Sequence, residues 1–231
     1  MTRPAGSTSR FAAELIAGPL RHGFAVGHGY ARFDDDVLAL TPPGAPRMPN
    51  GIETDVVLTV GEPLLVGDGR FQTAADTITA GPRWEARPSP RVALTIRPSS
   101  SLALENLPGW GPGLTPLGDD ILVGYTAASA LAGAPLPPVD SWSDRTTALS
   151  RTLLSLAALG ELPEPAHRLL ENGDPEPLLR FGSSSGKGII VGLGAAPAPP
   201  APTVCRGRFA LDIALPDGPH TFDVCVSEAE C

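Results

Sequence analysis

The sequence of 231 residues predicts an α+β protein, and three observations carry this prediction. From about residue 23 to residue 98, short apolar or alternating runs are cut by Gly, Pro and Asp, which is typical of short strands. From residue 119 to residue 196, a series of successive segments is predicted as helix. Residues 203–227 form two alternating runs around Pro216-Asp217-Gly218, which predicts a β-hairpin.

We therefore expect three regions along the chain. Residues 1–98 form a β-rich N-terminal region, barrel-like or a sandwich, with a short leading helix at 8–20 that ends at Gly18-Pro19. Residues 99–196 form a helical region that carries two Gly-rich loops, each leading into a helix. Residues 197–231 form a C-terminal hairpin that packs on the rest.

The individual elements follow from local patterns. Strands are expected within residues 24–33, 36–41, 51–60, 63–73 and 91–98, with a hairpin turn at 67–69, where Gly-Asp-Gly interrupts an apolar run. Helices are expected at 119–133, 141–160, 163–174, 176–181 and 182–196. In the second of these helices, Ser143 is the expected N-cap and Gly160 the expected stop.

Charge and hydropathy exclude several classes of function. The net charge is −8 and the basic residues form no cluster, so we expect no nucleic-acid partner. No apolar run approaches the roughly 18 residues of a membrane span, so we expect no membrane partner. The first residues lack the apolar core of a signal peptide, and we therefore expect a cytoplasmic protein.

Cysteine and histidine positions predict neither a disulfide framework nor a zinc site. Cys205, Cys225 and Cys231 form no CxxC pair, and in the cytoplasm reduced thiols are expected. The four histidines are scattered and offer no ligand spacing.

A degenerate internal repeat links the two Gly-rich loops. The segment GDDILVGYTAA at 118–128 aligns with GKGIIVGLGAA at 186–196, and Gly, Val, Gly, Ala and Ala coincide. Each copy follows a loop of small and hydroxyl residues. Two buried helices could also resemble each other by chance, so the repeat is a hypothesis at this point.

Both copies have the composition of an anion site. Glycines let the backbone turn tightly, and the following helix directs unpaired N–H groups and its positive dipole end toward the loop. The expected substrate-binding residues are Gly111, Gly113, Leu114, Thr115 and Gly118 in the first unit, and Ser183, Ser184, Ser185 and Gly186 in the second.

Asp119, Asp120 and Lys187 are the candidate catalytic residues. Asp is a favoured first-turn residue, so a structural capping role is one reading of the pair. The alternatives are that the pair binds a divalent metal, binds a substrate amide or amine group, or acts in acid–base catalysis. The loop GSSSGK at 182–187 lacks the spacing and the Ser or Thr of an NTPase phosphate loop, but its hydroxyls and Lys187 still suit an anion.

The stretch GPGLTPLGDDILVGYTAA at 111–128 resembles the signature of the oxamate carbamoyltransferase subunit AllH-like family, roughly G-P-G-L-T-P-S-G-D-D-hydrophobic-L-x-G. Residues 146–160 and the second Gly-rich loop resemble two further motifs of the family, and the likeness covers about residues 105–196. The chain departs from the pattern at Leu117, where Ser is usual, at Ser183, where His is usual, and at Lys187-Gly188, where Trp-Asp is usual.

The resemblance implies a subunit of a carbamoyltransferase of purine-nitrogen catabolism, working beside FdrA-like and other subunits. Its small anionic ligands, carbamoyl phosphate and oxamate, suit two helix N-termini. No cofactor is expected to be required, and a divalent metal held by Asp119 and Asp120 stays open. Two alternatives also stay open: a non-catalytic binding or scaffold subunit, and a stand-alone lyase or hydrolase acting on a small carboxylate.

Overall fold

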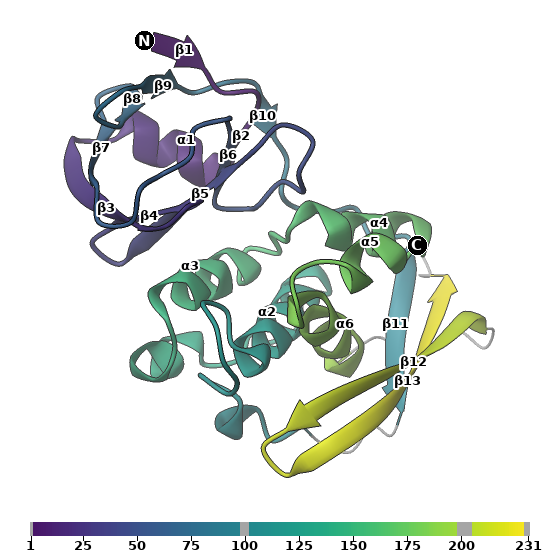
Figure 1. Ribbon diagram of the computed structural model, residues 1–231. Coiled ribbons are helices and arrows are strands. Elements are labelled where there is room, and N and C mark those ends of the chain that lie inside the picture. Colours follow the sequence, from purple (N-terminus) through teal and green to yellow (C-terminus); the bar gives the residue numbers. More distant parts are fainter. Residues whose placement is uncertain (1, 98–101, 198–204, 229–231) are drawn as a thin grey trace. The chain divides into compact units, whose positions relative to one another are not determined.

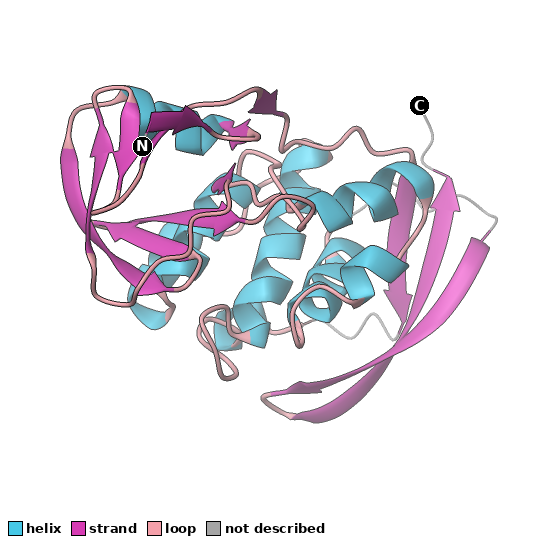
Figure 2. Cartoon of the chain, turned by 45° about the horizontal axis from the view of Figure 1, so that its top comes forward, coloured by secondary structure: helices cyan, strands magenta, loops and turns pink. Residues whose placement is uncertain are grey.

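The structure is a computed structural model that describes residues 2–97, 102–197 and 205–228. Contacts within the chain divide it into two compact units, residues 1–86 and 87–231. The expected boundary after residue 98 lies twelve positions later than this division, and the strand at Val92–Arg97 pairs within the second unit. The mixed α+β class is confirmed (Figure 1, Figure 2).

The first unit is a ten-stranded sheet around one helix, α1 (Arg10–Ala17). The strands are β1 (Thr2–Pro4), β2 (Thr8–Ser9), β3 (Arg21–Gly27), β4 (Tyr30–Phe33), β5 (Asp36–Thr41), β6 (Gly51–Glu53), β7 (Pro63–Gly67), β8 (Arg70–Gln72), β9 (Thr77–Thr79) and β10 (Arg83–Trp84). Their order is β1-β9-β8-β7-β3-β4-β5-β6-β2-β10. The sheet curves like a half-barrel, as the sequence predicted, and encloses a core that includes Ile16, Phe33 and Phe71 (Figure 1).

Local signals explain several elements of this unit. The Ser9 side chain accepts a hydrogen bond from the Ala12 N–H and so caps α1. Asp68 and Gly69 both have positive φ, 49° and 82°, and form the two-residue turn between β7 and β8 that the sequence predicted. The expected strand over 51–60 ends at Glu53, because the chain then crosses to the turn between β3 and β4, where the Leu58 N–H donates to the His28 carbonyl oxygen.

The second unit combines helices with a three-stranded sheet. Its helices are η1 (Leu104–Asn106), α2 (Leu117–Leu131), η2 (Val139–Arg145), α3 (Ala148–Ala157), α4 (Glu164–Asn172), α5 (Glu176–Leu179) and α6 (Ser185–Ala195). Its strands are β11 (Val92–Arg97), β12 (Cys205–Leu215) and β13 (Gly218–Glu228), in the antiparallel order β11-β13-β12. The predicted hairpin is confirmed as β12 and β13, and α2 and α6 lie side by side in the middle of the unit (Figure 1).

The start of the helix expected at 141–160 was predicted wrongly. The α-helix begins at Ala148, where the Thr147 side chain accepts a hydrogen bond from the Ser150 N–H, and residues 139–145 form a 3₁₀ turn instead. The Thr146 hydroxyl donates to Asp119 of α2, and Thr146 and Thr147 are extended. The extended residues Thr146 and Thr147 therefore separate Ser143 from the helix that it was expected to cap.

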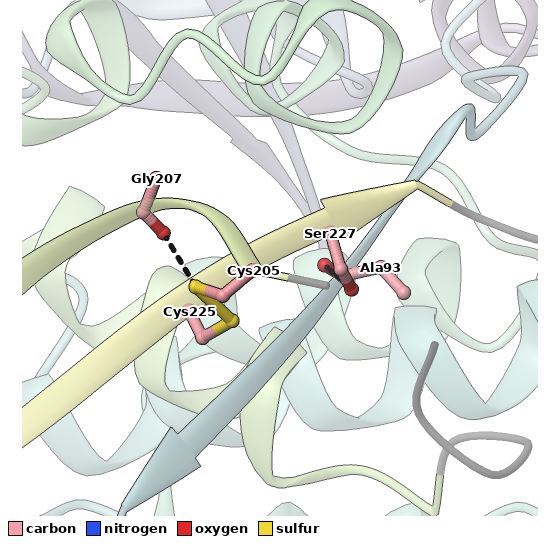
Figure 3. The surroundings of a disulfide bond; sticks show 5 residues. All are labelled: Ala93, Cys205, Gly207, Cys225 and Ser227. Atoms are coloured by element: carbon pink, nitrogen blue, oxygen red, sulfur yellow. Dashed lines mark hydrogen bonds between the residues drawn. A yellow bond between two sulfur atoms is a disulfide. The ribbon is translucent and has the colours of Figure 1, made fainter. Parts of the chain in front are cut away.

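The expectation of free thiols is wrong for two of the three cysteines. Cys205 and Cys225 form a disulfide between β12 and β13 (Figure 3). A bulge at Arg206 shifts the start of β12 relative to β13, and the two Cα atoms lie 5.7 Å apart, within the range that a disulfide spans. Cys231 lies outside the described residues.

Within the described residues, no helix has the length and apolar character needed to cross a membrane.

Candidate functional site

Helices α2 and α6 touch through glycines that the internal repeat places at equivalent positions. A Cβ atom added at Gly124 would lie 2.2 Å from the carbonyl oxygen of Ile189, and one added at Gly192 would lie 2.0 Å from that of Ile121. Gly124 and Gly192 are 68 positions apart in the sequence, as are Ile121 and Ile189. The two contacts are therefore related by a pseudo-twofold axis, and the repeat is present in three dimensions as well as in sequence.

The two helices also run in the same direction. A Cβ added at Gly188, in the first turn of α6, would approach Leu117 at the start of α2. One full turn further along, Gly192 contacts Ile121. Because the contacts advance together along both helices, their N-termini lie at the same end of the pair.

The first turn of each helix contains a second glycine that the fold requires. A Cβ at Gly118 would lie 2.0 Å from the carbonyl oxygen of Leu107, and one at Gly186 would lie 1.6 Å from that of Leu178. The chain that precedes each helix therefore packs directly against the helix backbone, and these two predicted site residues have a structural reason to be glycine.

Two hydroxyl groups join the N-termini of α2 and α6. The Oγ1 atom of Thr115 and the Oγ atom of Ser185 lie 3.1 Å apart. The N-cap positions are Pro116 and Ser184, and neither provides a side-chain cap hydrogen bond. In the two first turns, the N–H groups of Gly118 and Gly186 donate to the carbonyl oxygens of Trp110 and Phe181. The positive dipole ends of the two helices meet beside the two hydroxyls, an arrangement suited to an anion.

Both carboxylate oxygens of Asp119 accept hydrogen bonds from groups within the chain. Its Oδ1 atom accepts a hydrogen bond of 2.7 Å from the Gly109 N–H, and its Oδ2 atom accepts one from the Thr146 hydroxyl. The side chain is completely buried. Asp119 therefore fixes both the Gly-rich loop before α2 and the segment that leads into α3.

The carboxyl group of Asp120 differs from that of Asp119 in its hydrogen bonding. It is only 2% exposed, and its Oδ2 atom is buried without a hydrogen-bond partner. Loss of solvation raises the pKa of this carboxyl group to about 8, and the nearby Asp119 charge also raises it, whereas hydrogen bonding to Ser185 and Thr115 lowers it. Asp120 is consequently a mostly protonated acid at pH 7, next to the two hydroxyls.

Lys187 lies in the first turn of α6 and is half-buried. No carboxylate among the described residues forms an ion pair with it. The next residue, Gly188, does contact Asp120, since a Cβ there would lie 2.8 Å from the Asp120 Cβ. The first turn of α6 therefore borders Asp120 rather than the carboxylate of Asp119.

The other predicted substrate-binding residues lie further out. Gly111 and Gly113 adopt positive φ, 105° and 106°, in an exposed loop, and the Leu114 carbonyl oxygen accepts a hydrogen bond of 2.6 Å from the Thr147 hydroxyl. Ser183 is exposed and Ser184 half-buried. Thr115, Asp120, Ser185 and the first turns of α2 and α6 thus lie together in one cluster. The more exposed loop residues Gly111, Gly113 and Ser183 lie outside it.

Thr146 is a member of this region that the sequence analysis did not identify. It lies 27 residues from Asp119, in a stretch predicted as helix. A threonine before a helix is too common a feature to signal a long-range partner, so no local pattern could have found it.

The cluster offers little to a metal ion. No group of three or more His, Cys, Asp or Glu side chains with suitable placement occurs among residues 2–97, 102–197 and 205–228. Both oxygens of Asp119 already accept hydrogen bonds, so the pair Asp119 and Asp120 does not present four free carboxylate oxygens.

Comparison with known protein families matches part of the chain. A search of curated proteins and a search of solved structures returned no match to this chain. The family model described as oxamate carbamoyltransferase subunit AllH matches residues 107–196, which include α2, α3, α4, α5 and α6 and hence the whole cluster. The segment from residue 107 to residue 196 is therefore AllH-like, as the motif at 111–128 predicted.

Proposed function

We propose that this chain is a subunit of a carbamoyltransferase and that it binds a small anionic substrate, such as carbamoyl phosphate or oxamate, where the N-termini of α2 and α6 meet. The observation that carries the proposal is the buried, unpartnered Oδ2 atom of Asp120 beside the Thr115–Ser185 hydroxyl pair. A buried polar atom without a partner is rare in a folded protein and has a cost, which a ligand can remove by bonding to it.

The charges at the cluster favour an anion. Two parallel helices direct their positive ends to the same place, which favours negative charge there, and the Asp119 carboxylate in the first turn of α2 supplies part of it. A protonated Asp120 does not repel an anion and can donate a hydrogen bond to it. Lys187 adds a cation on the first turn of α6. A planar carboxylate or carbamoyl group can then accept hydrogen bonds from both helices.

The roles proposed for the residues follow from their contacts. Thr115, Ser185, Asp120 and the backbone of the first turns bind the substrate. Asp119 positions the loop through Gly109 and Thr146 and does not touch the ligand. Lys187 attracts the anion and orients it. No step in this assignment requires a metal or an organic cofactor, and affinity should be unchanged by EDTA.

Several finer assignments belong to the same proposal. The partners would be FdrA-like and other transferase subunits, the pathway purine-nitrogen catabolism, and the compartment the cytoplasm. The AllH description supports a subunit of a multi-subunit transferase, and these further assignments extend it.

One observation favours the alternative of a non-catalytic binding subunit. With Asp119 committed to Gly109 and Thr146, Asp120 is the one carboxyl group of the pair with an oxygen left for a ligand. A pair of carboxyl groups that share acid and base roles is therefore not present. Turnover by the isolated chain would support a catalytic subunit, whereas binding without turnover would support the alternative.

Isothermal titration of the full chain with oxamate, and separately with carbamoyl phosphate, tests the binding site. Replacing Ser185 with Ala or Asp120 with Ala should each weaken binding about ten-fold or more, since each removes a hydrogen bond to a charged ligand. Ser183→Ala is the matched control, because this exposed hydroxyl lies two residues away on the same loop. Equal affinity of the Ser183→Ala and Ser185→Ala variants, or no binding by the unmodified chain, would contradict the proposal.

A further inference from the structure

Strand β12 lies at the edge of the three-stranded sheet in the second unit. Strand β12 spans 11 residues and pairs with β13 on one side, and no other strand of the described residues pairs with it (Figure 1). An unpaired edge strand exposes a row of N–H and C=O groups that another strand can bind. Proteins often protect such edges with proline, but β12 contains none.

The register of the hairpin shows which groups point to the free edge. Leu215 and Gly218 flank a two-residue turn and so form a hydrogen-bonded pair, after which hydrogen-bonded and non-hydrogen-bonded pairs alternate. Pro219, which has no N–H, lies opposite Ala214 at a non-hydrogen-bonded position, in agreement with this alternation. The even-numbered residues of β12 from 208 to 214 therefore direct their backbone groups away from β13.

The same residues carry a self-complementary charge pattern. The side chains of Arg208, Ala210 and Asp212 are all exposed on one face of the strand. Arg208 forms no ion pair with another described residue, and Asp212 accepts a hydrogen bond of 2.7 Å from the Thr221 hydroxyl on β13. If a second β12 lies antiparallel with Ala210 opposite Ala210, each Arg208 faces the Asp212 of the other copy.

Registers of the two β12 strands that are shifted by two residues do not place Arg208 opposite an acidic side chain. Shifting the second strand by two residues places Arg208 opposite either Ala210 or Ala214, so Arg208 loses its acidic partner. In the first of these registers Arg206 would face Asp212, but Arg206 lies at the bulge of β12 and already forms an ion pair with Glu228. On the inner face of the strand, the central register places Phe209 opposite Leu211, so apolar side chains also face each other. The disulfide between Cys205 and Cys225 holds the first residue of β12 to β13 and so limits fraying of the edge (Figure 3).

We propose that two copies of this chain associate through β12, antiparallel and centred on Ala210, so that two three-stranded sheets join into one of six strands. The interface is isologous, and its twofold axis passes between the two Ala210 residues. Specificity comes from the two symmetry-related Arg208–Asp212 pairs, and most of the directional bonding comes from the backbone.

Sedimentation equilibrium of the full chain over a range of concentrations tests this proposal. Arg208→Asp and Asp212→Arg should each raise the dimer dissociation constant about ten-fold, because each change replaces two attractive pairs by two repulsive ones. The double variant Arg208→Asp with Asp212→Arg restores opposite charges and should recover affinity close to that of the unmodified chain. Asp140→Arg, an exposed acid in η2, is the control for net charge and should leave the constant unchanged.

Ala210→Pro provides a second, independent test. It removes an N–H that points to the free edge and makes no bond to β13, so the hairpin should fold while the dimer is lost. Circular dichroism confirms folding of each variant. A chain that is monomeric at every concentration, a double variant no tighter than the single ones, or a dimer unaffected by Ala210→Pro would overturn the proposal.

Discussion

The hydroxyl oxygens of Thr115 and Ser185 lie 3.1 Å apart although 70 residues separate them in the sequence. They meet because α2 and α6 pack in parallel through glycines, which brings both N-termini to one place. Thr115, Ser185 and the neighbouring Asp120 therefore form one cluster only if this close packing is maintained. The stability of the helix pair and the function of the cluster should be linked.

The first prediction concerns the glycines at the contact. Gly124→Ala and Gly192→Ala should each destabilise the second unit by about 1–3 kcal/mol, because the new Cβ would lie 2.2 Å or 2.0 Å from a carbonyl oxygen of the facing helix. Urea denaturation followed by circular dichroism measures the change. Gly207→Ala is the control, since a Cβ there meets no atom within 4 Å. Similar small effects at all three positions would show that the helices can separate without cost.

The second prediction concerns pH. The pKa of Asp120 is raised to about 8 in the folded chain, above the usual value of about 4 in an unfolded chain. Between these two values, the folded state holds a proton that the unfolded state has released, so stability falls as pH rises and becomes constant above the folded pKa. Asp120→Asn cannot titrate and lacks this dependence.

Comparing the two proteins isolates the contribution of Asp120. Between pH 5 and pH 7.5, the unfolding free energy of the unmodified chain should decrease relative to that of Asp120→Asn by on the order of 1 kcal/mol per pH unit. Urea titrations at several pH values give both curves. Parallel curves would mean that the Asp120 carboxyl titrates normally in the folded chain.

The third prediction concerns Asp119 and Thr146. Asp119→Ala should cost about 2–3 kcal/mol of stability, since it leaves the Gly109 N–H and the Thr146 hydroxyl without their acceptor. Thr146→Val should cost less, and the double variant should show non-additive losses, because the two side chains share one bond. Strict additivity in this double-mutant cycle would indicate that the two residues act independently.

Local patterns predicted the elements whose causes are local. The turn at Asp68-Gly69 and the hairpin at β12 and β13 follow from residues that are close in sequence. The repeat of α2 and α6 spans 68 positions, but each copy is a short local pattern. Gly124 and Gly192 could be recognised in the sequence because they recur at the same offset in both copies, and the structure gives that recurrence a physical meaning.

Long-range pairing could not be predicted in the same way. The strand at Val92–Arg97 was recognised, but its partner is β13, more than a hundred residues later, and no local pattern specifies that choice. The sequence alone favours Ser143 as the N-cap of this helix. The helix instead begins at Ala148, after Thr146 has donated a hydrogen bond to Asp119. Because that bond depends on tertiary structure, no local pattern predicts the true start of the helix.

The last prediction concerns the disulfide. Under denaturing, non-reducing conditions, alkylation should leave Cys205 and Cys225 unmodified, and proteolysis should give one linked peptide pair. Because the bridge closes a loop of 20 residues, replacing both cysteines with Ser should lower the unfolding free energy by about 3 kcal/mol through the entropy of the unfolded chain. Cys231→Ser is the control and should leave the linked pair unchanged. Full alkylation of Cys205 and Cys225 without reductant, in protein prepared with its thiols trapped at lysis, would show that the two sulfur atoms are thiols in the cell and that the pairing of β12 with β13 holds without a covalent bond.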